Sequence, residues 1–409
     1  MHEKKSIATL IAIATVPLLM LLSAPLSLGA TYKVLYSFSG GTDGSILYGG
    51  VVLDRQGNLF GPTAGGGQDL AGTIYKLTHE PGGIWTKTII HDLNYQTEGG
   101  HPNGGMVFDQ AGNLYGTTWS GGPQLVGTIF QLVPNPDGPW TLNLLYEGGS
   151  QSGLAIDPAG NLFGFGGPGQ YHEGDIFRLS PNPGGWEYSE IYSFGLNQDD
   201  GGTFYAPLIL DQAGNLYGTS FGGGHGRFCG GGGGCGTAYK LHPTPDGTWT
   251  EHIFHRFGST PQDGRYLYGS LVRDVAGNLY GTTLQGGNDG TIFKLSRKPS
   301  GGWKETILYN FPNAVKNGGA PAAGMVFDQA GNLYGTASSG GDAKCQCGVV
   351  YKLDHNPDET WTYSVLHRFH GTDGWSPQAP LVMDKKGHLY GTTVSGGPGG
   401  YGVVFKITP

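Results

Sequence analysis

The sequence contains few charged residues, few cysteines and few long apolar stretches. Only 13% of its 409 residues are charged, and the formal net charge is −8 at pH 7. A chain of this acidity offers little basic surface to phosphates, so we expect no nucleic-acid partner. Apart from one segment near the N-terminus, no apolar run approaches the length of a membrane span.

That N-terminal segment has the composition of a secretory leader. Lys4 and Lys5 precede the apolar residues 7–22, and the small residues Gly29 and Ala30 follow. This order predicts a signal peptide over residues 1–30, with an uncleaved anchor as the alternative because Leu28 fits the cleavage rule only in part. We therefore expect a secreted chain, extracellular or in the cell envelope, without a membrane span once the signal is removed.

Apolar stripes at helical spacing are also missing, and one short phrase recurs in their place. It reads Asp-x-x-Gly-Asn-Leu-Tyr-Gly-Thr or a close variant, and its copies start 48–63 residues apart. A period of this length is typical of repeats that pack against one another. The phrase starts at Asp54, Asp109, Asp157, Asp211, Asp274, Asp328 and Asp384.

Each repeat except the last contains four short segments rich in β-branched and aromatic residues, separated by many of the 78 glycines and 25 prolines. Such segments are typical of strands, and sheets of four strands bury both faces when they pack radially. The sequence therefore predicts an all-β fold, a seven-bladed β-propeller of four-stranded antiparallel blades. The blades are expected near residues 49–103, 104–151, 152–205, 206–268, 269–321, 322–377 and 378–409.

The last of these repeats has only three strand segments. Its fourth is expected at residues 31–38, whose sequence TYKVLYSF matches KETILYNF at residues 304–311 in its apolar and aromatic positions. The N-terminal strand would then complete the last blade and leave no open edge in the ring. Residues 31–409 are accordingly predicted to form one domain.

Each residue of the repeated phrase can be explained by backbone conformation or by packing. The aspartate ends the inner strand, the glycine permits a positive φ in a tight turn, and the asparagine starts the next strand. The turn lacks the further carboxylates that a calcium site needs. We therefore interpret the phrase as structural, with a repeated catalytic or calcium role as the alternative.

The repeated unit GNLYGTT, GG and GTIFKL, followed by a tryptophan strand and an Asp-Gly loop, resembles the GloVer, or choice-of-anchor, tandem-repeat family of secreted bacterial proteins. The resemblance covers essentially all of the chain after residue 30. It implies a secreted or surface propeller and no particular activity. Function must therefore be sought in the variable loops.

Loops between second and third strands and between fourth and first strands should share one face of the propeller. Trp119 and Trp375 lie off the repeat in such loops, and with Tyr266 and other loop aromatics they could form a stacking platform for sugars or peptides. The alternative is that they only anchor the loops. The other six tryptophans open fourth strands and are expected to be packing residues.

Two further features of this face are candidate ligand-binding groups. Asp200, Asp263 and Asp373 belong to Asp-Gly pairs that could form a rim of carboxylates around the channel mouth, although Asp-Gly is also ordinary turn composition. Arg273 takes a position that is apolar in the other six blades, so we expect it either to reach the channel or to pair with a carboxylate.

The cysteines predict two local disulfides in an exported protein, Cys229 with Cys235 and Cys345 with Cys347, with free thiols or a soft-metal site as the alternative for the second pair. The histidine pairs 252/255 and 367/370 are three apart on expected strands, so they should point to opposite faces. The sequence therefore predicts no metal site and no cofactor.

These observations favour a secreted, non-enzymatic binding or structural propeller that recognises a glycan or a protein through loops on one face. Two alternatives remain open. One is a polysaccharide lyase or hydrolase that uses acidic residues at the channel mouth. The other is a subunit of an extracellular assembly or filament that associates with copies of itself.

Overall fold

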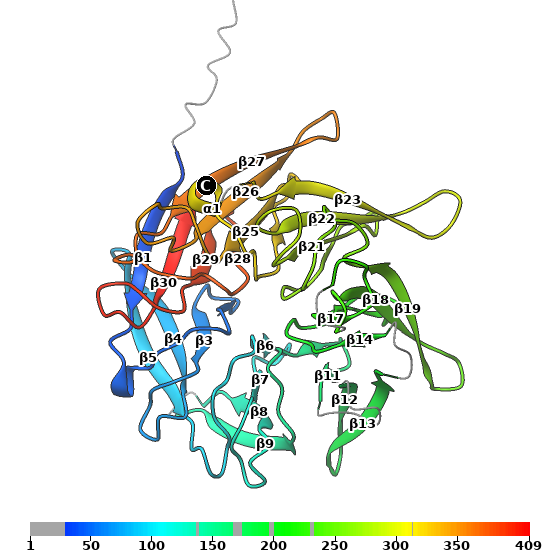
Figure 1. Ribbon diagram of the computed structural model, residues 1–409. Coiled ribbons are helices and arrows are strands. Elements are labelled where there is room, and N and C mark those ends of the chain that lie inside the picture. The colour runs from blue at the N-terminus through cyan, green and yellow to red at the C-terminus, as the bar shows by residue number, and fades with distance from the viewer. Residues whose placement is uncertain (1–28, 136–138, 167–173, 196–199, 230–232, 313) are drawn as a thin grey trace, which may run out of the picture.

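The computed structural model describes residues 29–135, 139–166, 174–195, 200–229, 233–312 and 314–409, so the expected signal peptide lies almost wholly outside the described residues. Seven four-stranded antiparallel sheets stand radially around a common centre (Figure 1). The predicted seven-bladed propeller is thereby confirmed. The helical segments in the described part are the 3-10 turn η1 (Gly41–Asp43) and α1 (Ala314–Asn317), and neither has the length to cross a bilayer.

In each blade the strands follow one another in antiparallel order. Blades 1 to 3 consist of β2 (Val52–Leu53), β3 (Leu59–Thr63), β4 (Thr73–Glu80) and β5 (Ile84–Asp92); β6 (Val107–Phe108), β7 (Leu114–Thr118), β8 (Thr128–Val133) and β9 (Thr141–Glu147); β10 (Ala155–Ile156), β11 (Leu162–Phe165), β12 (Asp175–Asn182) and β13 (Gly185–Ser193).

Blades 4 to 6 repeat the same plan. They consist of β15 (Ile209–Leu210), β16 (Leu216–Thr219), β18 (Thr237–Pro243) and β19 (Trp249–Arg256); β20 (Val272–Arg273), β21 (Leu279–Thr283), β22 (Thr291–Arg297) and β23 (Trp303–Asn310); β24 (Val326–Phe327), β25 (Leu333–Ala337), β26 (Val349–His355) and β27 (Trp361–Arg368). A two-stranded ribbon of β14 (Gly201–Gly202) and β17 (Gly222–Gly223) lies in the loops of blade 4.

The seventh blade joins the two ends of the described chain. Its sheet has the order β1-β30-β29-β28, from β1 (Thr31–Ser37), β30 (Val403–Thr408), β29 (Leu389–Thr392) and β28 (Val382–Met383). In the register of β1 with β30, Thr31 lies opposite Thr408 and Ser37 opposite Val403. The predicted closure by the N-terminal strand is confirmed, and Figure 1 shows β1 beside β30.

The repeated phrase forms the turn between the first two strands of a blade. In blade 5, Asp274 accepts hydrogen bonds from the backbone N–H of Asn278 (2.8 Å), its side-chain amide (2.7 Å) and the Tyr280 hydroxyl (3.0 Å). Gly277 has φ +84°, which only glycine adopts without strain. In the last blade the Nδ1 atom of His388 takes the place of the asparagine amide, 2.8 Å from Asp384.

Other residues of the repeat connect one blade to the next. The Thr282 hydroxyl donates to the Ala323 carbonyl of the following blade at 2.9 Å, and Trp303 packs on Phe254 of the preceding blade with ring centroids 4.3 Å apart. Equivalent threonine bonds join Thr117 to Ser152, Thr219 to Gly269, Thr336 to Ala379 and Thr392 to Leu47. The phrase is therefore a structural connector, and the fourth-strand tryptophans are packing residues, as predicted.

The inner strands are shorter than the sequence suggests, with two paired residues each. The residues just before them run directly against the backbone of the neighbouring blade. A Cβ atom added to Gly104 would lie 2.4 Å from the Ser152 oxygen, and one added to Gly269 would lie 2.5 Å from the Ala323 carbonyl carbon. These segments therefore form a tight inner ring, and the side chains next to it surround the axis.

Candidate functional site

A cavity of about 380 Å³ lies where the seven blades meet, on the face of the second-to-third and fourth-to-first loops. All seven blades contribute the residue six positions before the aspartate of the repeated phrase. This position precedes the tight inner ring, so its side chain lies at the mouth of the axis. The seven residues are Tyr48, Asn103, Gln151, Tyr205, Tyr268, Ala322 and Gln378.

Three of these side chains are tyrosines that converge from different blades. Tyr205 and Tyr268 stack with ring centroids 4.4 Å apart and an interplanar angle of 19°. Burial raises the pKa of Tyr268, and the neighbouring Tyr205 and Tyr48 raise it further. Trp119 from the loop after β7 also lines the cavity and is 52% exposed. The cavity therefore presents aromatic faces that a ligand ring could stack on.

The other polar side chains that line the cavity are the amides of Asn103, Gln151 and Gln378 and the hydroxyl of Ser270. The side-chain oxygen of Asn103 is buried and accepts no hydrogen bond from the described residues. Gln378 donates its amide to the Ser376 hydroxyl at 2.9 Å. Among the described residues that line the cavity there is no Asp, Glu, Lys, Arg or His. Neutral donors and acceptors beside aromatic rings suit an uncharged ligand that carries hydroxyl groups.

The structure brings together only part of the predicted aromatic platform. Trp119 lines the cavity directly, whereas Tyr266 does not. The Tyr266 ring stacks on Phe221 at 5.0 Å, and Phe221 in turn contacts Tyr205 edge-on at 5.4 Å. Trp375 is 47% exposed on the loop between β27 of blade 6 and β28 of blade 7, and it does not line the cavity. Tyr266 therefore supports the tyrosine cluster, and Trp375 stands apart from it.

The three aspartates expected around the channel mouth lie elsewhere. Asp200 and Asp263 are only 4% exposed, and each fourth-to-first loop places its acid between the outer strands of two blades. Asp263 is 3.2 Å from His255 on β19, and Asp373 is 3.0 Å from His367 on β27. None of the three lines the central cavity. The prediction that these aspartates form a rim at the channel mouth is therefore wrong. The loops that carry them cross the outer part of the propeller, where the acids contact side chains of the outer strands.

Arg273 also differs from its expected position. Its side chain is exposed, and its guanidinium lies 5.9 Å from the centre of the Tyr217 ring in the preceding blade. One guanidinium nitrogen would be 3.1 Å from a Cβ atom on Gly277, so the side chain covers its own aspartate turn. Because β20 runs away from the cavity toward that turn, Arg273 does not reach the channel mouth.

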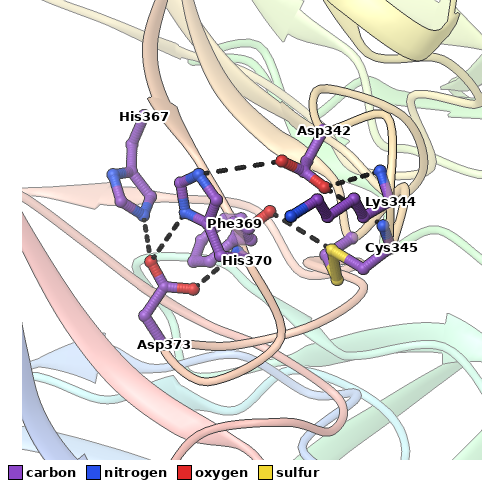
Figure 2. Close-up of a disulfide and its surroundings, with 8 residues drawn as sticks. Asp342, Lys344, Cys345, His367, Phe369, His370 and Asp373 are labelled. Atoms are coloured by element: carbon purple, nitrogen blue, oxygen red, sulfur yellow. Dashed lines mark hydrogen bonds and ion pairs between the residues drawn. A yellow bond between two sulfur atoms is a disulfide. The ribbon is translucent and has the colours of Figure 1, made fainter.

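Both predicted disulfides are present, with Cα–Cα distances of 5.3 Å for Cys229–Cys235 and 5.1 Å for Cys345–Cys347. Figure 2 shows the second one beside two histidines of blade 6. His367 and His370 both face Asp373, at 3.0 and 3.6 Å from the same carboxylate oxygen. The expectation of opposite faces is wrong for this pair because β27 ends at Arg368, so strand alternation does not extend to His370.

A second depression, of about 740 Å³, lies on the other face between blades 7 and 1. The repeated turns at Asp54 and Asp384 and the packing residue Trp85 form its walls, and a similar gap of about 360 Å³ occurs between blades 1 and 2. Its recurrence shows that this depression follows from the divergence of neighbouring blades. Its basic side chains are Lys33, Arg55, Lys385, Lys386 and Lys406.

Sequence reasoning missed Tyr48 and Tyr205 as residues of one site with Tyr268. A signal was available in the repeat register, where the position six before each aspartate holds Tyr, Asn, Gln or Ala beside small residues. Variation at one position of an otherwise regular repeat marks a place that packing does not dictate. Without the fold, nothing indicated that this position surrounds the axis.

Comparison with known proteins identifies the repeat and the fold. A family model described as Gloeobacter/Verrucomicrobia repeat matches residues 25–229 and 226–409 in tandem, which confirms the resemblance seen in the sequence. No curated protein sequence matches the chain.

Among solved structures, an ancestral GH74 enzyme is similar with a TM-score of 0.61 and 12% identity over 89% of this chain. The match covers 48% of the GH74 enzyme, so the present chain spans about half of its length. A putative 6-phosphogluconolactonase from Bacteroides uniformis gives a TM-score of 0.50 and 13% identity, over 78% of this chain and 83% of that protein. At these identities the likeness shows the propeller fold alone.

Proposed function

We propose that this chain, which belongs to the Gloeobacter/Verrucomicrobia repeat family, is a secreted binding module that holds a neutral glycan in the central cavity. One observation carries the proposal. All seven blades direct a side chain to one mouth, and those side chains are aromatic, amide-bearing or small, without a charge.

The chemistry of a neutral sugar matches these groups. Its C–H faces pack on aromatic rings, and its hydroxyls both donate and accept hydrogen bonds. Tyr48 and Trp119 supply exposed rings, and the unpaired oxygen of Asn103 supplies a buried acceptor. A charged ligand would lose hydration in this cavity without gaining an opposite charge.

The lining also supports binding without turnover. Glycoside hydrolysis by the common mechanism requires two carboxyl groups about 5–10 Å apart on either side of the scissile bond. The acids that the sequence suggested for this task, Asp200, Asp263 and Asp373, lie among the outer strands. The two disulfides support an oxidising compartment outside the cytoplasm.

The proposal is tested by incubating the secreted form of the protein with a broad panel of neutral and acidic polysaccharides. Retention would be measured by affinity electrophoresis, and released products by mass spectrometry. We expect retention by at least one neutral polysaccharide and no shortened chains. Preference for acidic polysaccharides, cleavage of a chain, or capture of only protein partners would each contradict the proposal.

A further inference from the structure

The fourth-to-first loops create the same three-residue arrangement at several junctions between blades. An acid from the loop lies between a side chain on the outer strand of the preceding blade and one on the outer strand of the following blade. The sets are Tyr36, Asp43 and Lys87; Tyr192, Asp200 and Glu251; His255, Asp263 and Glu305; and His367, Asp373 and Tyr32.

Among these four junctions, the one between blades 4 and 5 is filled entirely with side chains that bind metals. His255 comes from β19, Asp263 from the loop and Glu305 from β23. The Nε2 atom of His255 is 3.2 Å from an Asp263 oxygen and 3.5 Å from a Glu305 oxygen, and the three ligand atoms lie within 4.8 Å of one another.

These separations suit a small divalent cation. An ion with bonds of about 2.0–2.2 Å in tetrahedral geometry holds its ligand atoms roughly 3.4 Å apart. Calcium prefers six or more oxygen ligands and is less suited to a site with an imidazole nitrogen. One imidazole with two carboxylates is a donor set that zinc accepts.

The three side chains are largely removed from water and held in place. The side chain of Asp263 is 2% exposed, that of Glu305 14% and that of His255 21%. The Ser259 hydroxyl and backbone N–H donate to the other Asp263 oxygen at 2.7 and 2.8 Å, which orients that carboxylate as supporting groups orient metal ligands. The second oxygen of Glu305 is buried and has no partner among the described residues.

A bound cation would offset the repulsion between the two carboxylates at this junction. Asp263 and Glu305 both face the imidazole of His255, so two carboxyl groups share one largely buried junction. A nearby positive charge favours the ionised form of a carboxyl group, whereas a neighbouring carboxylate disfavours it. A divalent ion between the three side chains would supply that charge and would accept lone pairs from both carboxylates and from the imidazole.

We propose that His255, Asp263 and Glu305 bind one divalent ion of the zinc type, which connects the outer strands of blades 4 and 5. The ion would stabilise the fold. The site lies outside the central cavity, so this proposal is independent of the proposed glycan binding.

The experiment uses the full secreted protein after treatment with a chelator, titrated with Zn²⁺ by calorimetry and followed by thermal unfolding. We expect one Zn²⁺ per chain and a rise in Tm on loading. Glu305→Gln should weaken Zn²⁺ binding at least tenfold, since the amide is a poor ligand. Glu251→Gln is the matched control, because it changes the same register position one blade earlier, where Tyr192 replaces the histidine, and it should leave the affinity unchanged.

The absence of stoichiometric Zn²⁺ binding, or a Glu305→Gln variant that binds like the wild type, would overturn the proposal. If Glu305→Gln does not fold, X-ray absorption at the zinc edge of the loaded wild type decides the question. The proposal expects oxygen and nitrogen ligands with a single imidazole. Sulfur ligands, or two or more imidazoles, would place the ion elsewhere in the chain.

Discussion

At the scale of single residues, buried acids make the stability of this propeller depend on pH. Burial and the neighbouring Asp200 raise the pKa of Glu251 to about 8. In the unfolded chain the same carboxyl titrates at about 4.3. Between these two values the unfolded chain releases a proton that the folded chain retains, so the contribution of Glu251 to stability is lost as the pH rises through this window.

Glu251→Gln should therefore stabilise the protein at alkaline pH. The amide resembles the protonated acid in shape and does not ionise. We expect the free energy of unfolding at pH 8 to rise by roughly 1–3 kcal/mol, with no difference near pH 4. Thermal unfolding followed by circular dichroism across this range measures the effect, and the exposed Glu187→Gln serves as control. A variant less stable than the wild type at pH 8 would contradict the assignment.

The threonine of the repeated phrase is a second residue with a measurable role. Thr282→Val keeps the volume of the side chain but leaves the buried Ala323 carbonyl of the next blade without this donor. We expect a loss of about 1–3 kcal/mol in the free energy of unfolding, measured by denaturant titration. The exposed Thr306→Val on β23 is the control and should change stability little. Equal effects at the two sites would show that the interblade bond contributes nothing.

At the scale of elements, the strands and their order were predictable because each repeat contains the same turn residues and the same alternation of apolar and polar positions. The ring closure by β1 also followed from the sequence, since one repeat lacked a strand that the N-terminus supplied. The short inner strands, the position of His370 beyond β27 and the outer placement of Asp200 did not follow. Each depends on contacts between neighbouring blades, which no single repeat encodes.

Strand β1 offers a direct test of closure. A chain that starts at residue 39 would expose the edge of β30, whose hydrogen bonds β1 satisfies. We expect this chain to aggregate or associate through that edge, with broad thermal unfolding. Addition of a peptide with the sequence of residues 31–38 should restore monomeric behaviour in size-exclusion chromatography. A shortened chain that stays monomeric with an unchanged Tm would contradict the role of β1.

At the scale of the whole molecule, the propeller separates its stabilising and recognising groups. The repeated phrase, the threonines and the fourth-strand tryptophans connect the blades, and several acid–base pairs lie at the outer junctions. The seven residues at the mouth of the axis do not connect the blades in this way, and their residue type varies around the ring. This division explains why the fold could be predicted readily from the sequence, whereas the aspartates were wrongly expected at the channel mouth.

An uncharged cavity also implies a binding reaction that responds little to salt. We expect the affinity for a neutral glycan to change less than about twofold between 50 and 500 mM NaCl, because no ion pair forms with the cavity. The affinity can be measured by calorimetry at each salt concentration. A steep loss of affinity with salt would instead indicate an acidic ligand at the basic depression between blades 7 and 1.

The central claim is tested most directly by titrating the retained oligosaccharide into the wild type and two tryptophan variants. Trp119→Ala removes an exposed ring from the cavity, and Trp375→Ala removes one of similar exposure on the same face but outside it. We predict that Trp119→Ala weakens binding at least tenfold while Trp375→Ala leaves the dissociation constant unchanged. Equal affinities for the wild type and Trp119→Ala, or a loss only with Trp375→Ala, would show that the ligand binds elsewhere.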